Sequence, residues 1–311
     1  MNKFKHIFGP VPSRRLGRSL GIDLVPFKIC SYDCLYCQLG RTTKKTIKRE
    51  DFVPLAEVTE ELKQKLSESK EIDYISFSGS GEPTLNSGIG SLIAKVKALT
   101  KIPVAVLTNG SLLFDKAVQD CLLEADLVLP SLDAGTESAF KKINCPHPEL
   151  DFARMVEGLI SFRKRFKGRI YLEVFLLAGI NTSEEELTRI KELIEKINPD
   201  KVQLNTAARP TSFNNVFPLA REHLEEACQF LGKKAEIISY PKEKSISPNI
   251  SCASILALLK RRPCTLEEIA HLTGTSQLEV RKEINRLREK GEIQEKHQAD
   301  KTYFARKEGD L

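Results

Sequence analysis

Residues 74–108 read YISFSGSGEPTLNSGIGSLIAKVKALTKIPVAVLT. Residues 74–78 and 104–108 are short β-rich runs, and residues 89–99 between them carry the apolar spacing of an amphipathic helix. Parallel strands must be joined by a long crossover connection, which is usually a helix. This stretch therefore predicts a βαβ unit with a glycine-rich turn directly after its first strand.

The same alternation continues on both sides of this unit. Further strands are expected over residues 19–25, 127–132, 170–178 and 201–205, and further helices over residues 55–67, 117–124, 151–166 and 183–197. Such alternation is typical of an α/β fold with a parallel sheet. Six βα units are too few for a complete eight-fold barrel, and residues 220–240 add only one helix and a short strand. The sequence therefore predicts a partial (βα)6 TIM-like barrel over residues 1–240.

A change of composition after residue 240 predicts a second, smaller domain. Residues 241–250 are polar, contain two prolines and are expected to form a linker. Thr265 and Glu268 form the capping-box signature of a helix start. The tail has the order of a winged helix-turn-helix domain, with helices over 254–260, 265–273 and 276–290 and a hairpin of 292–295 with 301–305. We predict this domain over residues 251–308.

Composition excludes several classes of protein. The 311 residues are 41% hydrophobic and 29% charged, which excludes disordered, collagenous and coiled-coil chains. The longest apolar runs are shorter than the roughly 18 residues that a bilayer span needs, so no membrane segment is expected. The first residues show no apolar signal core, and we therefore expect a cytoplasmic protein. In a reducing compartment, cysteines serve as metal ligands or free thiols before they form disulfides.

The strongest chemical signal is a cluster of three cysteines after the first expected strand. Residues 30–37 read Cys30-Ser31-Tyr32-Asp33-Cys34-Leu35-Tyr36-Cys37. Three thiolates leave one iron of a four-iron cluster open to an outside ligand. A zinc site would need a fourth ligand nearby, and among the next hundred residues only Cys121 offers a further cysteine or histidine. The spacing therefore favours an iron-sulfur cluster over zinc.

Small and polar residues gather where the expected strands end. In α/β barrels, catalytic residues lie at the C-terminal ends of the strands. The residues at these positions are Gly79, Ser80, Gly81 and Glu82 after the second strand, Thr108 and Asn109 after the third, and Ser131 and Asp133 at the fourth. Each group also has a plainer explanation, because Gly-Pro and Asn-Gly sequences are common turns and Ser-Leu-Asp can cap a helix.

The cysteine spacing, with Tyr36 as the aromatic residue before the third cysteine, resembles that of the radical S-adenosylmethionine (radical SAM) superfamily. The resemblance implies that Cys30, Cys34 and Cys37 hold a [4Fe-4S] cluster whose open iron is chelated by S-adenosylmethionine. It further implies reductive cleavage of S-adenosylmethionine to a 5′-deoxyadenosyl radical, which abstracts hydrogen from an unidentified substrate. A small protein such as flavodoxin or ferredoxin is the electron donor that such chemistry implies.

The resemblance extends to the residues that contact S-adenosylmethionine. Residues 77–84 resemble the glycine-rich segment of the superfamily, with Ser80 where a second glycine is frequent and Glu82 placed to balance the methionine ammonium. Ser131 and Asp133 resemble the ribose-binding residues. Thr108, Asn109, residues 176–181 and Asn205 resemble the remaining polar and adenine contacts. The resemblance covers residues 15–210.

The sequence outside the cysteine motif resembles that of a particular subgroup. Residues 9–18 and 203–206 are similar to uncharacterised Fe-S oxidoreductases grouped near the wyosine synthases. The tricyclic-base tRNA synthases of that neighbourhood use another cysteine spacing and often a second cluster. The remaining cysteines, Cys121, Cys145, Cys228, Cys252 and Cys264, form no pairwise motif, so we expect no auxiliary cluster.

Charge suggests candidates for substrate binding. Residues 1–49 contain eleven basic and two acidic side chains, a net of +9, whereas the whole chain is +6. Such a segment can attract an anionic ligand, compensate a negative centre or form a solvated face. Arg14, Arg15 and Arg18 are candidates within it, and Arg209 is a better one because it follows the end of a strand.

Two other functions remain open. The protein could be a tRNA-modifying radical SAM enzyme that holds RNA between its basic N-terminus and residues 251–308. It could instead be an Fe-S-sensing transcription regulator that acts through the winged helix. Residues 251–311 contain twelve basic and ten acidic side chains, a net of only +2, which is weak for a DNA reader. For an enzyme, these hypotheses leave either a small molecule or RNA as the substrate.

Overall fold

The computed structural model describes residues 4–69, 71–211, 213, 216–238, 252–259, 262–273, 275–298 and 301–307. Its main sheet has eight strands in the order β1-β2-β5-β6-β7-β8-β9-β10. They are β1 (Ile7–Ser13), β2 (Gly17–Ile22), β5 (Tyr74–Phe77), β6 (Val104–Thr108), β7 (Leu127–Pro130), β8 (Arg169–Leu176), β9 (Lys201–Thr206) and β10 (Ala235–Ile237). The β1–β2 pair is antiparallel and the other pairs are parallel. The predicted α/β class with a mostly parallel sheet is confirmed.

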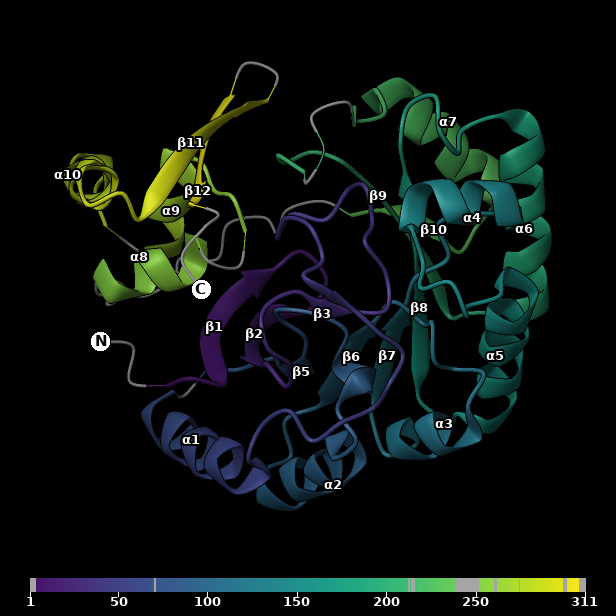
Figure 1. The fold of residues 1–311 in the computed structure, drawn as a ribbon, viewed down its shortest axis with the longest axis horizontal. Helices are drawn as coiled ribbons and strands as arrows, with labels where there is room; N and C mark the ends of the chain where they lie inside the picture. Colours follow the sequence, from purple (N-terminus) through teal and green to yellow (C-terminus); the bar gives the residue numbers. More distant parts are fainter. Residues whose placement is uncertain are drawn as a thin grey trace.

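Helices cover the outer face of the curved sheet (Figure 1). They are α1 (Leu55–Glu68), α2 (Ile89–Leu99), α3 (Lys116–Leu122), α5 (Phe152–Arg165), α6 (Glu184–Ile197) and α7 (Arg221–Leu231), with η1 (Pro83–Leu85) and α4 (Glu137–Asn144) nearer the strand ends. Their apolar sides and the outward strand residues form one continuous core. None of the helices within the described ranges is both long and apolar enough to cross a membrane.

The sheet has one strand that the sequence analysis missed. β1 contains Pro10 and Pro12. Proline has no backbone N–H to donate to a neighbouring strand, so these residues argue against a strand here. The strand lies at one edge of the sheet and β10 lies at the other, so the sheet is open, and an edge strand tolerates proline. With β1, and with β10 as the short strand expected within residues 220–240, the six expected strands become an eight-stranded sheet.

The inner face of the sheet begins with an apolar layer at the N-terminal ends of the strands. Leu16, Ala105, Leu127 and Leu129 are buried together there, against Tyr171. Residues of the opposite parity on β8 belong instead to the core under the helices, as the alternation of side chains along a strand requires. The polar part of the inner face therefore lies toward the C-terminal strand ends.

The C-terminal residues form a separate small core. Helices α8 (Cys252–Leu259), α9 (Leu266–Thr273) and α10 (Gln277–Glu289) are followed by an antiparallel pair, β11 (Ile293–Gln298) and β12 (Lys301–Arg306). The capping box is confirmed, because Thr265 N donates to Glu268 Oε2 at 3.0 Å and Glu268 N to Thr265 Oγ1 at 3.2 Å. The predicted linker, residues 241–250, lies outside the described residues.

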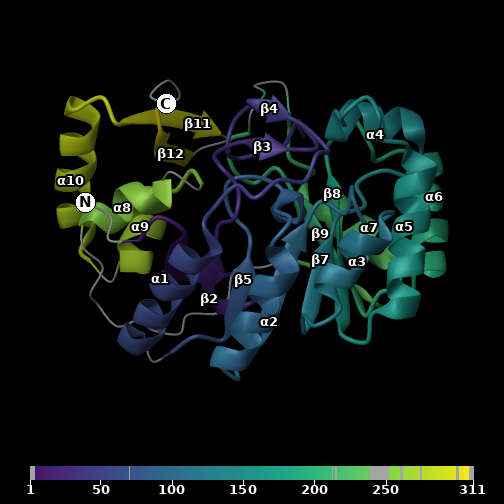
Figure 2. The ribbon, with the colours of Figure 1, turned by 60° about the horizontal axis from the view of Figure 1, so that its bottom comes forward.

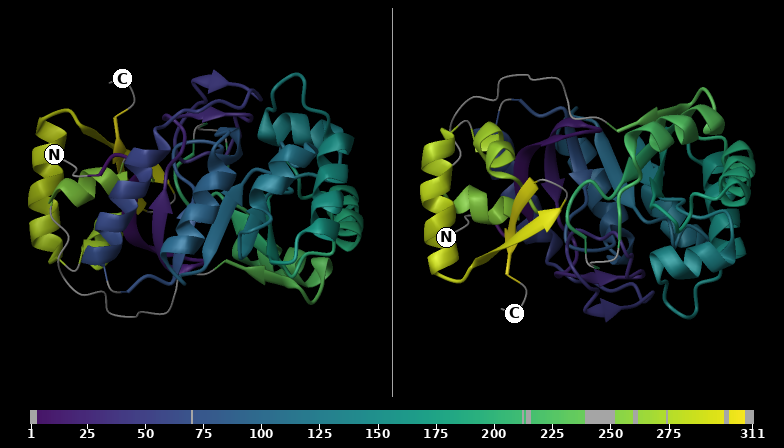
Figure 3. Two further views of the ribbon diagram at one scale, coloured as in Figure 1. Left: turned by 90° about the horizontal axis from the view of Figure 1, so that it is seen from below. Right: turned by 90° about the horizontal axis from the view of Figure 1, so that it is seen from above.

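This C-terminal unit lies beside the β1 edge of the sheet (Figure 3) and contacts the segment after β9. Arg209 is only 2% exposed, and its guanidinium donates to Pro263 O at 2.7 Å and to Glu268 Oε1 at 2.7 Å. Tyr303 Oη donates to Ala208 O at 3.0 Å. The expectation that Arg209 binds substrate was wrong, because the segment after β9 turns its side chain into the contact between the two units.

We predict that Arg209→Ala loosens the docking of the C-terminal unit. The substitution removes one donor from the buried carbonyl of Pro263 and one from the Glu268 carboxylate, at a cost of about 2 kcal/mol. Hydrogen exchange of residues 262–273 should become faster than in the natural protein. Arg221→Ala is the matched control, because the Arg221–Glu225 pair is exposed and contributes little. Equal exchange in both variants would contradict the assignment.

Candidate functional site

The three motif cysteines lie in one loop at the C-terminal edge of the sheet. The loop begins with β3 (Ile29–Cys30) and ends before β4 (Lys44–Lys45), and the two short strands pair in parallel at one end of the main sheet (Figure 2). The loop runs along the end of α4, where Leu35 N donates to Ile143 O at 2.9 Å. None of the three cysteines forms a disulfide, and each residue is partly buried. The fold therefore places the three motif cysteines in one loop beyond the strand ends.

Each of the three thiols accepts a hydrogen bond from a side-chain nitrogen. The donors come from different parts of the chain: Lys28 Nζ lies 3.0 Å from Cys37 Sγ, Asn109 Nδ2 3.6 Å from Cys30 Sγ, and Asn144 Nδ2 3.5 Å from Cys34 Sγ. Hydrogen bonds to ligand sulfurs are among the means by which a protein tunes a bound cluster. The donor set thus suits sulfurs that carry negative charge.

Burial opposes ionisation of the thiols in the chain without a bound metal. Burial raises the pKa of Cys30 to about 12, with the nearby Glu82 carboxylate adding to the effect. Burial also raises the pKa of Cys34. A thiol must lose its proton to bind a metal, so ligation at this site must release protons.

The glycine-rich loop after β5 packs directly against the start of the cysteine loop. A Cβ atom on Gly81 would lie 1.9 Å from the carbonyl oxygen of Ile29, so a residue with a side chain cannot occupy this position. Lys28 N donates to Ser80 O at 2.7 Å, and Glu82 N donates to Ile29 O at 3.2 Å. Gly79 has a positive φ of 146° and packs on the Asp23 carboxylate.

Glu82 is a buried residue whose side chain connects the loop after β5 to the end of β6. Its carboxylate accepts hydrogen bonds from Thr84 N and Oγ1, from Thr108 Oγ1 at 2.6 Å, and from Asn109 N at 2.7 Å. Burial raises its pKa despite these donors. The structure thus gives Glu82 and its neighbours Thr108 and Asn109 a role in shaping the loops. Their contacts with S-adenosylmethionine stay a prediction.

Asp133 follows β7 and connects the cysteine loop to β8. Its Oδ2 accepts from Tyr36 Oη and from Asn144 Nδ2 at 2.7 Å, and its Oδ1 accepts from Phe175 N at 3.0 Å. The rings of Tyr36 and Phe175 stack with centroids 3.8 Å apart. Burial raises the pKa of Asp133 to about 6. The motif aromatic residue and the predicted ribose contact are therefore neighbours.

Asn205 on β9 is the register neighbour of Phe175 on β8, but its side chain bonds to residues other than those that bind Asp133. Its Nδ2 donates to Glu173 Oε1 at 3.0 Å, and its Oδ1 accepts from Arg14 Nη1 at 3.3 Å. Glu173 also pairs with Arg15, and Ser131 forms an isolated bridge with Glu173. The β1–β2 turn thus reaches across to β8 and β9. By contrast, Arg18 pairs with Glu71 and Asp73 at the surface.

Several residues of this site escaped the sequence analysis. Lys28, Asn144 and Glu173 contact the predicted site residues, although they lie outside the motifs. Lys28 could have been noticed, since it stands two positions before Cys30 in the basic segment. Asn144 and Glu173 carry no such signal, because the folding of the chain alone brings them to the site.

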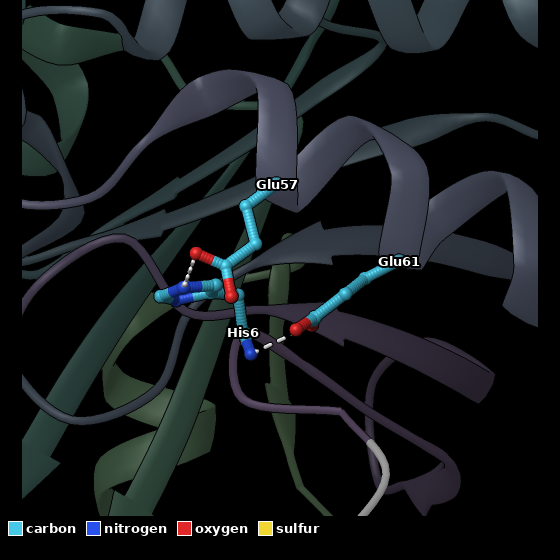
Figure 4. A group of neighbouring side chains, drawn as sticks. All are labelled: His6, Glu57 and Glu61. Atoms are coloured by element: carbon cyan, nitrogen blue, oxygen red, sulfur yellow. Dashed lines mark hydrogen bonds and ion pairs between the residues drawn. The ribbon is translucent and has the colours of Figure 1, made fainter.

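A second group of potential metal ligands lies away from the cysteines. His6, Glu57 and Glu61 have ligand atoms within 4.8 Å of one another (Figure 4). Glu61 accepts from the backbone nitrogens of residues 5–7, and Glu57 accepts from Lys5 Nζ at 2.7 Å. Because these bonds already engage both carboxylates, we assign the group to the packing of β1 on α1.

Comparisons with known proteins show the families to which the chain is related. Residues 24–194 match the radical SAM superfamily. The chain is 35% identical over 283 residues to the UPF0026 protein MJ1312 of Methanocaldococcus jannaschii, covering 87% of each protein. It is 45% identical over 298 residues to a Brachyspira hyodysenteriae protein named GTPase Obg, covering 94% of this chain but only 44% of that protein.

A solved structure has a related fold. A radical SAM methyltransferase from Sphaerobacter thermophilus superposes with a TM-score of 0.55 at 16% identity, over 70% of this chain and 65% of that one. At this level of identity the likeness concerns the fold alone. On the sequence matches, the chain belongs to the radical SAM superfamily and to the UPF0026 family.

Proposed function

We propose that Cys30, Cys34 and Cys37 bind a [4Fe-4S] cluster and that the protein uses it to cleave S-adenosylmethionine reductively. Membership of the radical SAM superfamily makes the chain an enzyme of that class and supports S-adenosylmethionine cleavage in general. The observation that carries the finer proposal is the loop in which each of the three thiols faces its own N–H donor. Three cysteines leave one iron for an external ligand.

The spacing of the sulfurs supports a cluster over a single zinc ion. Ligands on one tetrahedral zinc, at about 2.3 Å from the metal, stand roughly 4 Å apart. Among the described residues, the group whose ligand atoms all lie within 4.8 Å of one another is His6, Glu57 and Glu61, and the three thiols do not form such a group. They are thus spread more widely than one zinc ion requires.

The residues around the loop suit S-adenosylmethionine. We assign its contacts to Tyr36, Gly79, Ser80, Gly81, Glu82, Thr108, Asn109, Ser131, Asp133 and Asn205. Small residues at 79–81 let the ligand approach backbone groups, and polar side chains at the next strand ends offer partners for the ammonium and the ribose. The bonds of Glu82 and Asp133 within the protein hold these loops in place before the ligand arrives.

When bound, such a cluster supplies one electron that breaks a carbon-sulfur bond of S-adenosylmethionine, and the resulting 5′-deoxyadenosyl radical takes hydrogen from the substrate. The chain itself must orient the nucleoside, exclude water and hold the substrate. A small protein such as flavodoxin or ferredoxin would deliver the electron. The substrate, a small molecule or RNA, would meet Arg14, Arg15 and Glu173 on the inner face.

The C-terminal unit has the element order of a winged helix, which we propose as its fold. A DNA-reading role has little support, because acidic residues pair with two arginines of α10. Arg286 pairs with Glu283 on the same helix, and Arg288 pairs with Glu295 on β11. We therefore place the unit as a docked module of the enzyme, and rank an Fe-S-sensing regulator and a tRNA-binding role below this function.

Replacing a cluster ligand should abolish the reaction. Cys34→Ala removes the protein ligand of one cluster iron, so the cluster should no longer assemble. After anaerobic reconstitution with iron and sulfide, we expect this variant to lose the paramagnetic resonance of the reduced cluster. It should also form at least about 100-fold less 5′-deoxyadenosine. Cys228→Ala, in α7, is the matched control and should behave as the natural protein does. A reconstituted natural protein that binds zinc instead, or ignores S-adenosylmethionine, would refute the proposal.

The raised pKa of Asp133 predicts a pH dependence of stability. A carboxyl group that holds its proton more tightly when folded stabilises the protein below its unfolded pKa, and this contribution is lost as pH rises through about 6. In urea unfolding of the metal-free chain, the stability of the natural protein relative to Asp133→Asn should fall by on the order of 3 kcal/mol between pH 4 and pH 7. A difference that grows with pH would mean that the carboxyl is held ionised.

The exposed basic side chains of α10 test the nucleic-acid alternatives. Gel-shift titration of the full chain with duplex DNA and with tRNA should show a change in affinity of less than about threefold when Arg281 and Lys282 are both replaced by Ala, because acidic residues offset their charge. Tight, salt-sensitive binding to either probe that disappears in the variant would favour the corresponding alternative.

A further inference from the structure

Lys28 is a buried lysine at the predicted cluster site. Its residue is 3% exposed, and it stands two positions before the first motif cysteine. Its backbone joins two loops, because its N donates to Ser80 O at 2.7 Å and its O accepts from Thr43 N at 3.0 Å. These bonds hold the backbone of Lys28 between the glycine-rich loop and the end of the cysteine loop.

The ammonium group ends at a sulfur atom. Over the part of the chain that the structure describes, the hydrogen-bond acceptor of Lys28 Nζ is Cys37 Sγ, at 3.0 Å. A buried charge is costly unless a group of opposite charge compensates it. A neutral thiol is a poor partner for an ammonium group, whereas a metal-bound thiolate is a good one.

The three side-chain donors to the motif thiols differ in charge. Lys28 Nζ, the donor to Cys37 Sγ, belongs to a basic residue. The other two side-chain donors to the thiols, Asn109 and Asn144, are neutral amides. Lys28 is therefore the cation among the three donors.

We propose that Lys28 is a positioning residue whose fixed positive charge raises the reduction potential of the cluster. The inference rests on the proposed function. Taking up one electron adds negative charge to a centre that three thiolates already make anionic. A cation held against one ligand sulfur, away from bulk water, stabilises the reduced form more than the oxidised form. The effect acts through Cys37 and requires no contact of Lys28 with S-adenosylmethionine.

The test compares the full-length protein with Lys28→Met, Lys28→Gln and Lys28→Arg after anaerobic reconstitution. Potentials are measured without S-adenosylmethionine, by mediated redox titration followed with the paramagnetic resonance of the reduced cluster. We expect the two neutral variants to have an equilibrium constant for one-electron reduction at least about tenfold lower, a shift of about 59 mV to lower potential. Lys28→Arg, which keeps the charge, should remain close to the natural protein.

Each outcome decides the matter. Equal potentials in cluster-loaded Lys28→Met and Lys28→Arg would overturn the proposal. If the neutral variants fail to load iron while Lys28→Arg loads it, the charge serves assembly of the cluster and not its potential, and the proposal is overturned. Failure of all three variants to load would assign Lys28 a role in loop packing and would overturn it. A natural protein without any cluster would instead refute the proposed function.

Discussion

The glycine-rich loop after β5 approaches the backbone of Lys28 and Ile29 so closely that no side chain fits between them. A Cβ on Gly81 would stand 1.9 Å from Ile29 O, and two backbone hydrogen bonds hold the segments together. The first motif cysteine follows directly. This contact joins the cysteine loop to the C-terminal edge of the sheet, so the thiols and the small residues of the second strand end share one site.

Buried carboxylates then connect that site to the remaining strands. Glu82 accepts hydrogen bonds that connect the loop after β5 to the end of β6. Asp133 accepts hydrogen bonds from Tyr36, from Asn144 and from the backbone of β8. Both are almost fully buried, and each has several donors, as buried charged groups require. The site is therefore held by its own polar network before any ligand binds, and the strand ends cannot move independently.

Much of the fold could be predicted because its signals are local. The periodicity of apolar residues predicted most of the helices and the parallel strands. The capping box of Thr265 and Glu268 predicted the start of α9. β1 was missed because its prolines argue against a strand, and only its place at the sheet edge makes them acceptable. α4 was also missed, and with it the position of Asn144 beside Cys34.

By itself, the sequence determined the three-cysteine loop, most of the strands and helices in their order, and the small residues at the strand ends, because each is a pattern of neighbouring residues. Only the tertiary structure decided what the polar side chains face. Arg14 meets Asn205 across 191 positions of the chain, and Arg209 turns to the C-terminal unit and away from substrate. Such partners depend on how the sheet curves and which surfaces pack, and no local pattern encodes them.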